Sequence, residues 1–186
     1  MKITSPFIRK AIGPKTVTKS KLLKGWYIEM ELKWNKTCAI LKPTIQVKIT
    51  KEDVLDIICS AVNGGVGYWG ATSANDEDYS EAKKHLVEQG ADLKDICYEE
   101  VFAQILFDGK SLEITDIENG EKYFLSLEKL FIGLRKAIEE GYYSHYNWYV
   151  PEGDGFGEWQ LNCCQIDSEV ADIIIQFSLF GEVLFG

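Results

Sequence analysis

The chain has 186 residues, of which 46% are apolar and 12% aromatic, and its formal net charge is −9. This length predicts one domain with at most one appendage, and this apolar content supports a hydrophobic core, which excludes a wholly disordered chain. No apolar run is long enough to span a membrane, and the basic N-terminus lacks the continuous apolar segment of a signal peptide. We therefore expect a cytoplasmic protein with no membrane partner.

Charge is divided unevenly along the chain. Residues 1–51 contain twelve basic side chains and two acidic ones, whereas residues 52–186 contain eight basic and 27 acidic side chains. Such asymmetry favours a charged macromolecular partner, or self-association, over a small-molecule substrate. We expect residues 1–42 to form a basic N-terminal extension with a strand hairpin, and residues 43–186 to form an acidic core domain.

The N-terminal quarter is predicted to contain a basic arm followed by short strands. Residues 1–23 show only weak periodicity, which prolines and a glycine interrupt. Apolar and polar side chains then alternate over residues 26–34, which is typical of a half-buried strand. A turn after Asn35 leads to a second strand at residues 37–41, and the alternation resumes at residues 45–49.

The acidic core domain is predicted to combine helices with a β-hairpin. Thr50 followed by Asp53 resembles a capping box, which opens a helix that ends at Gly64 and Gly65. Further helices are predicted at residues 76–89, 98–107, 126–138 and 168–179, and a hairpin at residues 112–117 and 122–125. The sum is an α+β fold, with a mainly antiparallel sheet and three or four helices in a single compact domain, plus the basic extension.

Five cysteines are an odd number at irregular spacings, without a CxxC pair: Cys38, Cys59, Cys97, Cys163 and Cys164. Cys163 and Cys164 are adjacent, and adjacent cysteines rarely bridge one another because the disulfide geometry would be strained. The pattern indicates a reduced, intracellular protein in which most thiols act as small buried apolar groups.

Three glycines, Gly65, Gly67 and Gly70, match the GxGxxG fingerprint of dinucleotide-binding proteins. The fingerprint requires a strand before it and a helix after it, so that the pyrophosphate meets a helix N-terminus. Here a predicted helix precedes the motif, and the bulky Tyr68 and Trp69 stand before the third glycine. We therefore expect the glycines to end a helix and start a strand, and we expect no nucleotide cofactor.

Catalytic and metal-binding patterns are weak. His85 and His145 lie in different predicted elements, and Cys163, Cys164 and His145 lack a second CxxC or HxxxH motif to complete a tetrahedral zinc site. The same side chains could form a Cys–His nucleophilic pair, but no nucleophile elbow or oxyanion-hole sequence accompanies them. We expect no metal, no cofactor and no enzymatic activity, and a Cys–His hydrolase stays an alternative.

Acidic side chains gather along the core domain, and aromatic side chains gather in a predicted long loop at residues 141–166. Carboxylates spaced over a surface can imitate the phosphates of a DNA duplex, although they are also typical of an ordinary solvated surface. Tyr and Trp anchor many protein interfaces. The predicted partner-binding residues are Asp76, Glu77, Asp78, Glu81, Asp92, Asp95, Glu99, Glu100, Tyr146, Trp148, Tyr149, Glu152 and Asp154.

Basic side chains of the first 24 residues are predicted either to contact nucleic acid directly or to clamp the acidic body of a second copy. The second arrangement would give a homodimer and would explain why one end of the chain is basic and the rest acidic. We therefore slightly favour self-association or docking to a partner over contact with nucleic acid. The residues concerned are Arg9, Lys10, Lys15, Lys19, Lys21 and Lys24.

Several stretches of the core domain resemble one family of small phage and prophage proteins of Gram-positive bacteria. The matching stretches are residues 49–53, Gly64-Gly65-Val66-Gly67-Tyr68-Trp69, residues 126–129, and the most specific one, residues 171–176 with 180–186. The resemblance covers the C-terminal three-quarters of the chain and provides no catalytic residues.

Accessory phage proteins of this size and acidity are similar in kind to anti-CRISPR inhibitors, some of which act as acidic stoppers on a Cas nuclease. The resemblance therefore implies a non-enzymatic inhibitor of a bacterial defence nuclease, most concretely a type II Cas9 with its guide RNA, in the cytoplasm of the host cell. Two alternatives stay open: an oligomeric phage protein that sequesters a small signalling nucleotide, and a DNA-binding accessory protein that uses the basic arm.

Overall fold

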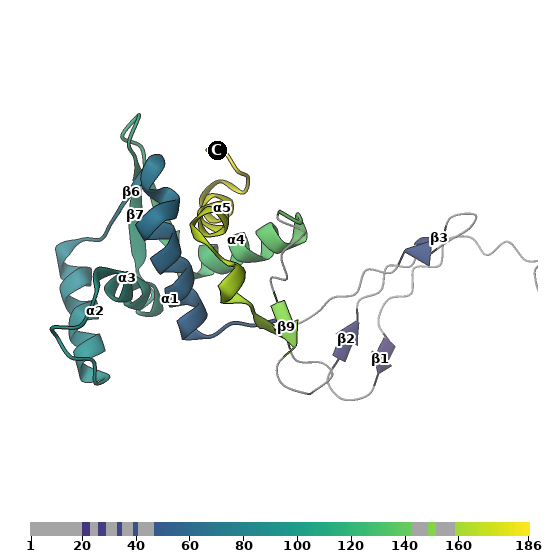
Figure 1. Cartoon of the computed structure of the whole chain (residues 1–186), viewed down its shortest axis with the longest axis horizontal. Helices are drawn as coiled ribbons and strands as arrows, with labels where there is room; N and C mark the ends of the chain where they lie inside the picture. Colours follow the sequence, from purple (N-terminus) through teal and green to yellow (C-terminus); the bar gives the residue numbers. More distant parts are fainter. Residues whose placement is uncertain are drawn as a thin grey trace, which may run out of the picture. The chain divides into compact units, whose positions relative to one another are not determined.

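The computed structural model describes residues 47–142 and 160–186. It also describes the backbone of five short strands and of residue 159. The chain divides into two units, residues 1–46 and 47–186 (Figure 1). The five strands are β1 (Ser20–Leu22), β2 (Trp26–Ile28), β3 (Lys33–Trp34), β4 (Ala39–Ile40) and β9 (Tyr149–Pro151).

Two antiparallel strand pairs make up the described part of the first unit. In the β1–β2 pair Lys21 lies opposite Tyr27, and in the β3–β4 pair Trp34 lies opposite Ala39. The predicted turn after Asn35 lies between β3 and β4, outside the described residues. β1 lies in the segment where the sequence predicts only a basic arm. The strand was not predicted because three residues are too few to show an alternation of apolar and polar side chains.

The described strands of the second unit form two small sheets. β6 (Gly70–Ser73), β7 (Ser111–Asp116) and β8 (Lys122–Ser126) form an antiparallel sheet with β7 in the middle, which confirms the predicted hairpin. β10 (Trp159–Leu161) pairs in parallel with β5 (Val47–Lys48) and antiparallel with β9. β9 and β10 lie in the segment predicted to be a long loop. The other residues of that segment up to 158, namely 143–148 and 152–158, lie outside the described residues.

Helices cover the three-stranded sheet, so the predicted α+β fold is confirmed. The described part of the chain has five α-helices, one at each range where the sequence predicts a helix, which is more than the three or four of the overall fold prediction. None of these helices is long and apolar enough to cross a membrane. They are α1 (Lys51–Ser60), α2 (Asp76–Glu88), α3 (Tyr98–Phe107), α4 (Leu127–Glu139) and α5 (Ser168–Phe180).

The most buried helix is α5, in which all residues from Val170 to Ser178 are buried. It packs against α4, its neighbour in Figure 1. Gly133 of α4 makes this close approach possible, because a Cβ atom there would lie 2.6 Å from the carbonyl oxygen of Ile174. Fully burying each isoleucine of α5 contributes about 1.5–3 kcal/mol to stability, so α5 is the centre of the core.

The chain between α1 and β6 forms a compact helical turn. The predicted capping box at the start of α1 is present, since the Thr50 side chain accepts from the Asp53 N–H and the Asp53 carboxylate accepts from the Thr50 N–H. After α1 the chain continues as a π-helical turn, Ala61–Gly65, and a 3₁₀ turn, Val66–Tyr68. Gly65 lies against α5, because a Cβ atom there would lie 2.5 Å from the Ser168 carbonyl oxygen.

Candidate partner-binding surfaces

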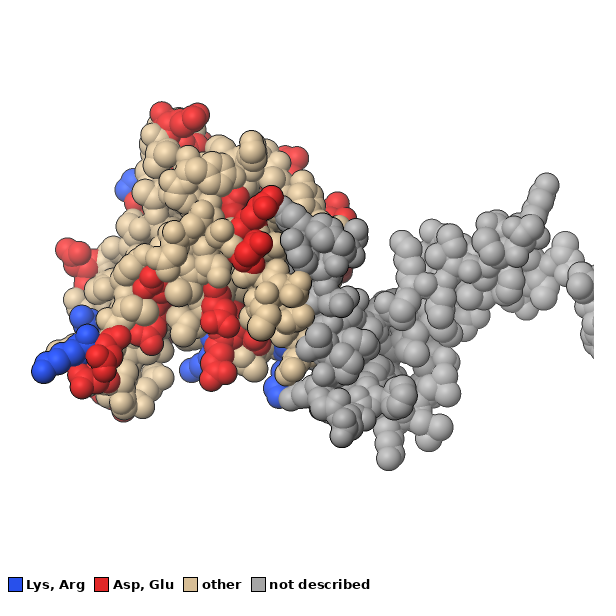
Figure 2. Space-filling model, viewed as in Figure 1, with Lys and Arg blue, Asp and Glu red and all other residues tan. Residues whose placement is uncertain are grey.

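The first predicted acidic stretch forms an exposed strip on α2. Asn75 caps the helix, since its side chain accepts a 2.7 Å hydrogen bond from the Asp78 N–H. Asp76, Glu77 and Glu81 are exposed, and we call these three residues the α2 acidic strip. Carboxylates in the first turn also favour the positive end of the helix dipole. Figure 2 shows acidic side chains spread over the visible face of this unit and basic ones at only a few positions.

Asp78 is directed into the protein and does not belong to the strip. Its carboxylate lies 3.3 Å from the Lys110 ammonium and also accepts from the Asn75 side chain. The hydrogen bond with Asp78 raises the pKa of Lys110, and the charges of Glu81 and Glu77 act in the same direction. The ion pair therefore ties the start of α2 to the chain before β7.

The acidic residues after α2 divide into exposed and structural ones. Asp92 and Asp95 are exposed in the loop that follows the helix, about 20 Å from its first turn at 1.5 Å per residue. Glu100 is half-buried and accepts a 2.9 Å hydrogen bond from the Cys97 N–H at the start of α3. Glu99 is only 7% exposed. The prediction that Glu99 faces a partner is therefore wrong: the side chain is buried, and its carboxylate accepts a 2.7 Å hydrogen bond from the Asn63 amide.

Several predicted site residues cannot be placed. Tyr149 and Lys21 are described only as backbone, in β9 and β1. The side-chain roles predicted for them stay predictions, as do those of residues outside the described part of the chain: Arg9, Lys10, Lys15, Lys19, Lys24, Tyr146, Trp148, Glu152 and Asp154.

A second candidate surface lies where the chain turns after α1, and the sequence did not predict it. We define the turn surface as Asn63, Gly64, Gly67, Tyr68 and Tyr98, all of which are exposed. The Tyr98 hydroxyl donates a 2.6 Å hydrogen bond to Asn63, and the Asn63 amide donates a 2.7 Å hydrogen bond to the buried carboxylate of residue 99. Burial raises the pKa of this carboxylate, but hydrogen bonds from its own backbone and from Asn63 outweigh burial and lower the net pKa.

The second tyrosine of the turn surface is anchored in the same way. The Tyr68 hydroxyl donates a 2.8 Å hydrogen bond to Asp172 of α5, which is only 4% exposed. The Trp69 indole N–H and the Gln176 amide each donate a 2.7 Å hydrogen bond to the same carboxylate. Burial raises the pKa of Asp172 although the three donors lower it, and burial together with Asp172 raises the pKa of Tyr68 to about 12.

The segment after α5 folds back over this network. Gln176 accepts hydrogen bonds from the N–H groups of Leu184 and Phe185, at 2.7 and 2.8 Å, and its amide donates to the Phe185 carbonyl at 2.9 Å. The Phe185 ring stacks on Trp69 with 4.6 Å between centroids. The Gln176 side chain therefore binds the backbone of two residues of this segment and the Asp172 carboxylate at the same time.

The glycine motif has a structural role, whereas the expectation of mostly buried thiols is wrong for the described cysteines: Cys59 and Cys163 are half-buried, and Cys97 and Cys164 are exposed. A helix precedes the motif and β6 follows it, as the sequence predicts, and Gly65 is buried against α5. The Cys163 thiol donates to Asp53 at 3.1 Å, and burial and Asp53 both raise its pKa, so the thiol stays protonated. His145, its partner in the hydrolase alternative, lies outside the described residues. No group of three or more metal-ligating side chains occurs in residues that the structure describes.

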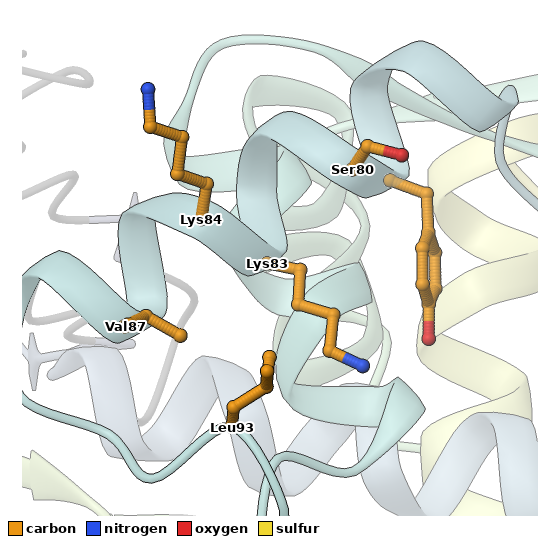
Figure 3. Close-up of a pocket in the computed structure, with 6 residues that line it drawn as sticks. Ser80, Lys83, Lys84, Val87 and Leu93 are labelled. Carbon is orange, nitrogen blue, oxygen red and sulfur yellow. The ribbon is translucent and has the colours of Figure 1, made fainter.

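A shallow groove of about 440 Å³ lies beside α2 (Figure 3). Its lining combines apolar side chains, including the exposed Val87 and Leu93, with Lys83 and Lys84, which point in different directions. This surface is mixed apolar and basic, so it differs in charge from the α2 acidic strip on the same helix.

Comparison with known proteins gives no family for this chain. It matches no protein-family model, and neither a curated protein nor a solved structure matches it significantly. The resemblance to phage proteins therefore stays a prediction.

Proposed function

We propose that this protein is a phage-encoded, non-enzymatic inhibitor that binds a bacterial defence nuclease, most concretely Cas9 loaded with its guide RNA. The observation that carries the proposal is the acidity of the unit 47–186, which has ten basic and 27 acidic side chains and a net charge of −17. The α2 acidic strip displays part of that charge on one exposed helix face.

Electrostatics provides the mechanism of inhibition. A nuclease holds its nucleic acid in a positively charged channel and contacts mainly the phosphates. A folded acidic protein can occupy that channel. Its carboxylates are already held on a helix, so little conformational entropy is lost when they bind. Association with such a channel is fast at low salt and weakens as added salt screens the charges.

Charge reversal on α2 tests the contact surface. The triple variant Asp76→Lys, Glu77→Lys, Glu81→Lys should weaken binding to guide-loaded Cas9 about 100-fold, since like charges in an interface cost several kcal/mol. Binding is measured by calorimetry at two salt concentrations.

A matched control separates the surface from net charge. The variant Glu118→Lys, Glu128→Lys, Glu140→Lys changes the charge by the same amount at three exposed sites away from α2, and Glu128 also lies in the first turn of a helix. Equal binding by both variants and the unmodified protein would remove the α2 strip from the interface.

The runner-up function is direct DNA binding through residues 1–46, which carry ten basic and two acidic side chains. This alternative predicts a gel shift of duplex DNA by the protein alone. It also predicts that the logarithm of the affinity falls linearly with the logarithm of salt concentration. A protein that inhibits the nuclease and does not shift DNA supports the inhibitor.

A further inference from the structure

We propose that the turn surface is a docking site for an arginine-bearing segment of a basic partner protein, with guanidinium groups stacked on Tyr68 and Tyr98. The proposal deepens the proposed function and rests on it only for the identity of the partner. It adds a second contact to the α2 acidic strip.

Both tyrosines are exposed and yet held in place. Tyr68 is 54% exposed and Tyr98 is 44% exposed, so each ring offers a face to a partner. The hydroxyl of Tyr68 is fixed by Asp172, and that of Tyr98 by Asn63. A tyrosine fixed in this way loses little conformational freedom on binding, which is a property of residues that dominate binding energy.

Two buried carboxylates support the two anchors. Asp172 holds Tyr68 directly, and Glu99 holds Tyr98 through Asn63. Burying a carboxylate is costly, and packing alone would be achieved more simply by an apolar side chain. These hydrogen bonds, one direct and one through Asn63, orient the two exposed rings and keep a carboxylate close to each of them.

The charges around the turn surface favour a cation. Burial raises the pKa values of both tyrosines, and nearby acidic groups act in the same direction: Asp172 and Glu169 on Tyr68, and Glu99 with the thiols of Cys59 and Cys97 on Tyr98. Negative charge close to an aromatic ring adds to the attraction between the ring face and a cation.

The backbone adds to this negative field. α1, the π-helical turn and the 3₁₀ turn form a helical stretch from Lys51 to Tyr68 that ends at the turn surface. The C-terminal end of a helix carries a partial negative charge and favours cations. In this described stretch none of the three elements has a basic side chain in its last turn. A cation from a partner would therefore be the group that neutralises the partial negative charge at the end of the helix.

Arginine fits this surface better than lysine does. A planar guanidinium stacks on a tyrosine ring while its N–H groups still reach carbonyl and carboxylate oxygens, whereas a lysine ammonium acts as a point charge. A Cβ atom at the exposed Gly67 would meet nothing within 4 Å, so the surface is open at that position, whereas a Cβ atom at Gly64 would lie 3.0 Å from the Cβ atom of Ser168.

The test uses the full chain and a short amidated peptide of alternating arginine and glycine as the probe, followed by calorimetry. The double variant Tyr68→Ala, Tyr98→Ala should bind the probe about tenfold more weakly. The same peptide with lysine in place of arginine should bind the unmodified protein more weakly. Unchanged affinity in the double variant, or equal affinity for the two peptides, would overturn the proposal.

A second variant does not disturb the hydrogen-bonded anchors. Gly67→Arg adds a cation at an exposed site with open space, so it should abolish probe binding while the midpoint of thermal unfolding stays unchanged. Two controls remove exposed side chains elsewhere: Tyr142→Ala, at a tyrosine that is 41% exposed, and Val87→Ala in the lysine-lined groove. Both controls should bind the probe as the unmodified protein does, and a loss in either would contradict the assignment to the turn surface.

Binding measurements with guide-loaded Cas9 then distinguish a failure of this proposal from a failure of the proposed function. If the probe binds the turn surface but guide-loaded Cas9 does not bind the protein, the proposed function fails and the docking site stands. If Cas9 binds the unmodified protein and Gly67→Arg equally well, the nuclease does not use the turn surface and the docking proposal fails for it.

Discussion

The Tyr68 hydroxyl and the Asp172 carboxylate, 104 residues apart in the chain, are joined by a 2.8 Å hydrogen bond. The bond fixes an exposed aromatic ring to the most buried helix of the protein. It joins the turn after α1 to α5, and Gln176 extends the same network to the segment after α5. The turn after α1 is therefore tied to the core helix beneath it.

Asp172 should make stability depend on pH. Burial raises its pKa above the ordinary value of 3.8, so the native state holds this proton to a higher pH than the unfolded chain does. Its contribution to the free energy of unfolding is therefore largest below about pH 4 and falls as the pH rises through the raised pKa. Asp172→Asn should remove this component. The check is chemical denaturation of both proteins from pH 4 to 7, and a constant difference between them would contradict the prediction.

Gly65 and Gly67 should differ in their tolerance of the same substitution to alanine. Gly65→Ala places a Cβ atom 2.5 Å from the Ser168 carbonyl oxygen, and overpacking of this kind costs about 1–3 kcal/mol. Gly67→Ala meets nothing within 4 Å and should stay within about 0.5 kcal/mol of the unmodified protein. Urea denaturation measures both, and equal stabilities would show that the turn does not pack on α5 as described.

Replacing Gln176 should loosen the end of the chain. Gln176→Leu leaves the N–H groups of Leu184 and Phe185 without their acceptor, at a cost of about 1–3 kcal/mol. Hydrogen exchange at these two amides should become faster than in the unmodified protein. Gln160→Leu, at an exposed glutamine in β10, is the control and should change neither stability nor exchange. Protected amides in the Gln176 variant would mean that another group holds the segment.

His85 should titrate above its ordinary pKa of 6.5, because its ring nitrogen pairs with Asp108 at 2.9 Å. The charges of Asp108, Glu81 and Glu88 act in the same direction. Since the folded-state pKa is raised, the stabilising effect is fully present below pH 6.5 and is lost as the pH rises through the raised value. NMR titration of the histidine signals, assigned with a His145→Gln variant, measures it. Asp108→Asn should return the pKa towards 6.5, and an unchanged value would contradict the pairing.

Local sequence signals predicted most of the secondary structure. The capping box at Thr50, the N-cap at Ser126 and the hairpin before it depend on neighbours within a few residues, so they could be read directly. The apolar run of α5 likewise predicted the most buried helix. β9 and β10 could not be predicted, because three residues are too few to show a strand pattern and β10 also depends on β5, which lies far earlier in the chain.

The candidate surfaces were less predictable than the fold. The exposure of Asp76, Glu77 and Glu81 follows from their place at the start of an amphipathic helix. Glu99 looks the same in the sequence, and only its contact with Asn63, 36 residues earlier, shows that it is buried. Asp172 sits within an apolar run, and this was the one sequence signal that could have marked it. Two of its three donors, Tyr68 and Trp69, lie 104 and 103 positions away in the chain.

The most direct test of the central claim is cleavage of target DNA by guide-loaded Cas9 with rising amounts of this protein, beside a gel shift of the target. The proposed function predicts that cleavage stops at near-stoichiometric protein, that the charge-reversed α2 variant fails to stop it, and that the gel shows loss of target capture. Undiminished cleavage at a large excess of protein would contradict the claim.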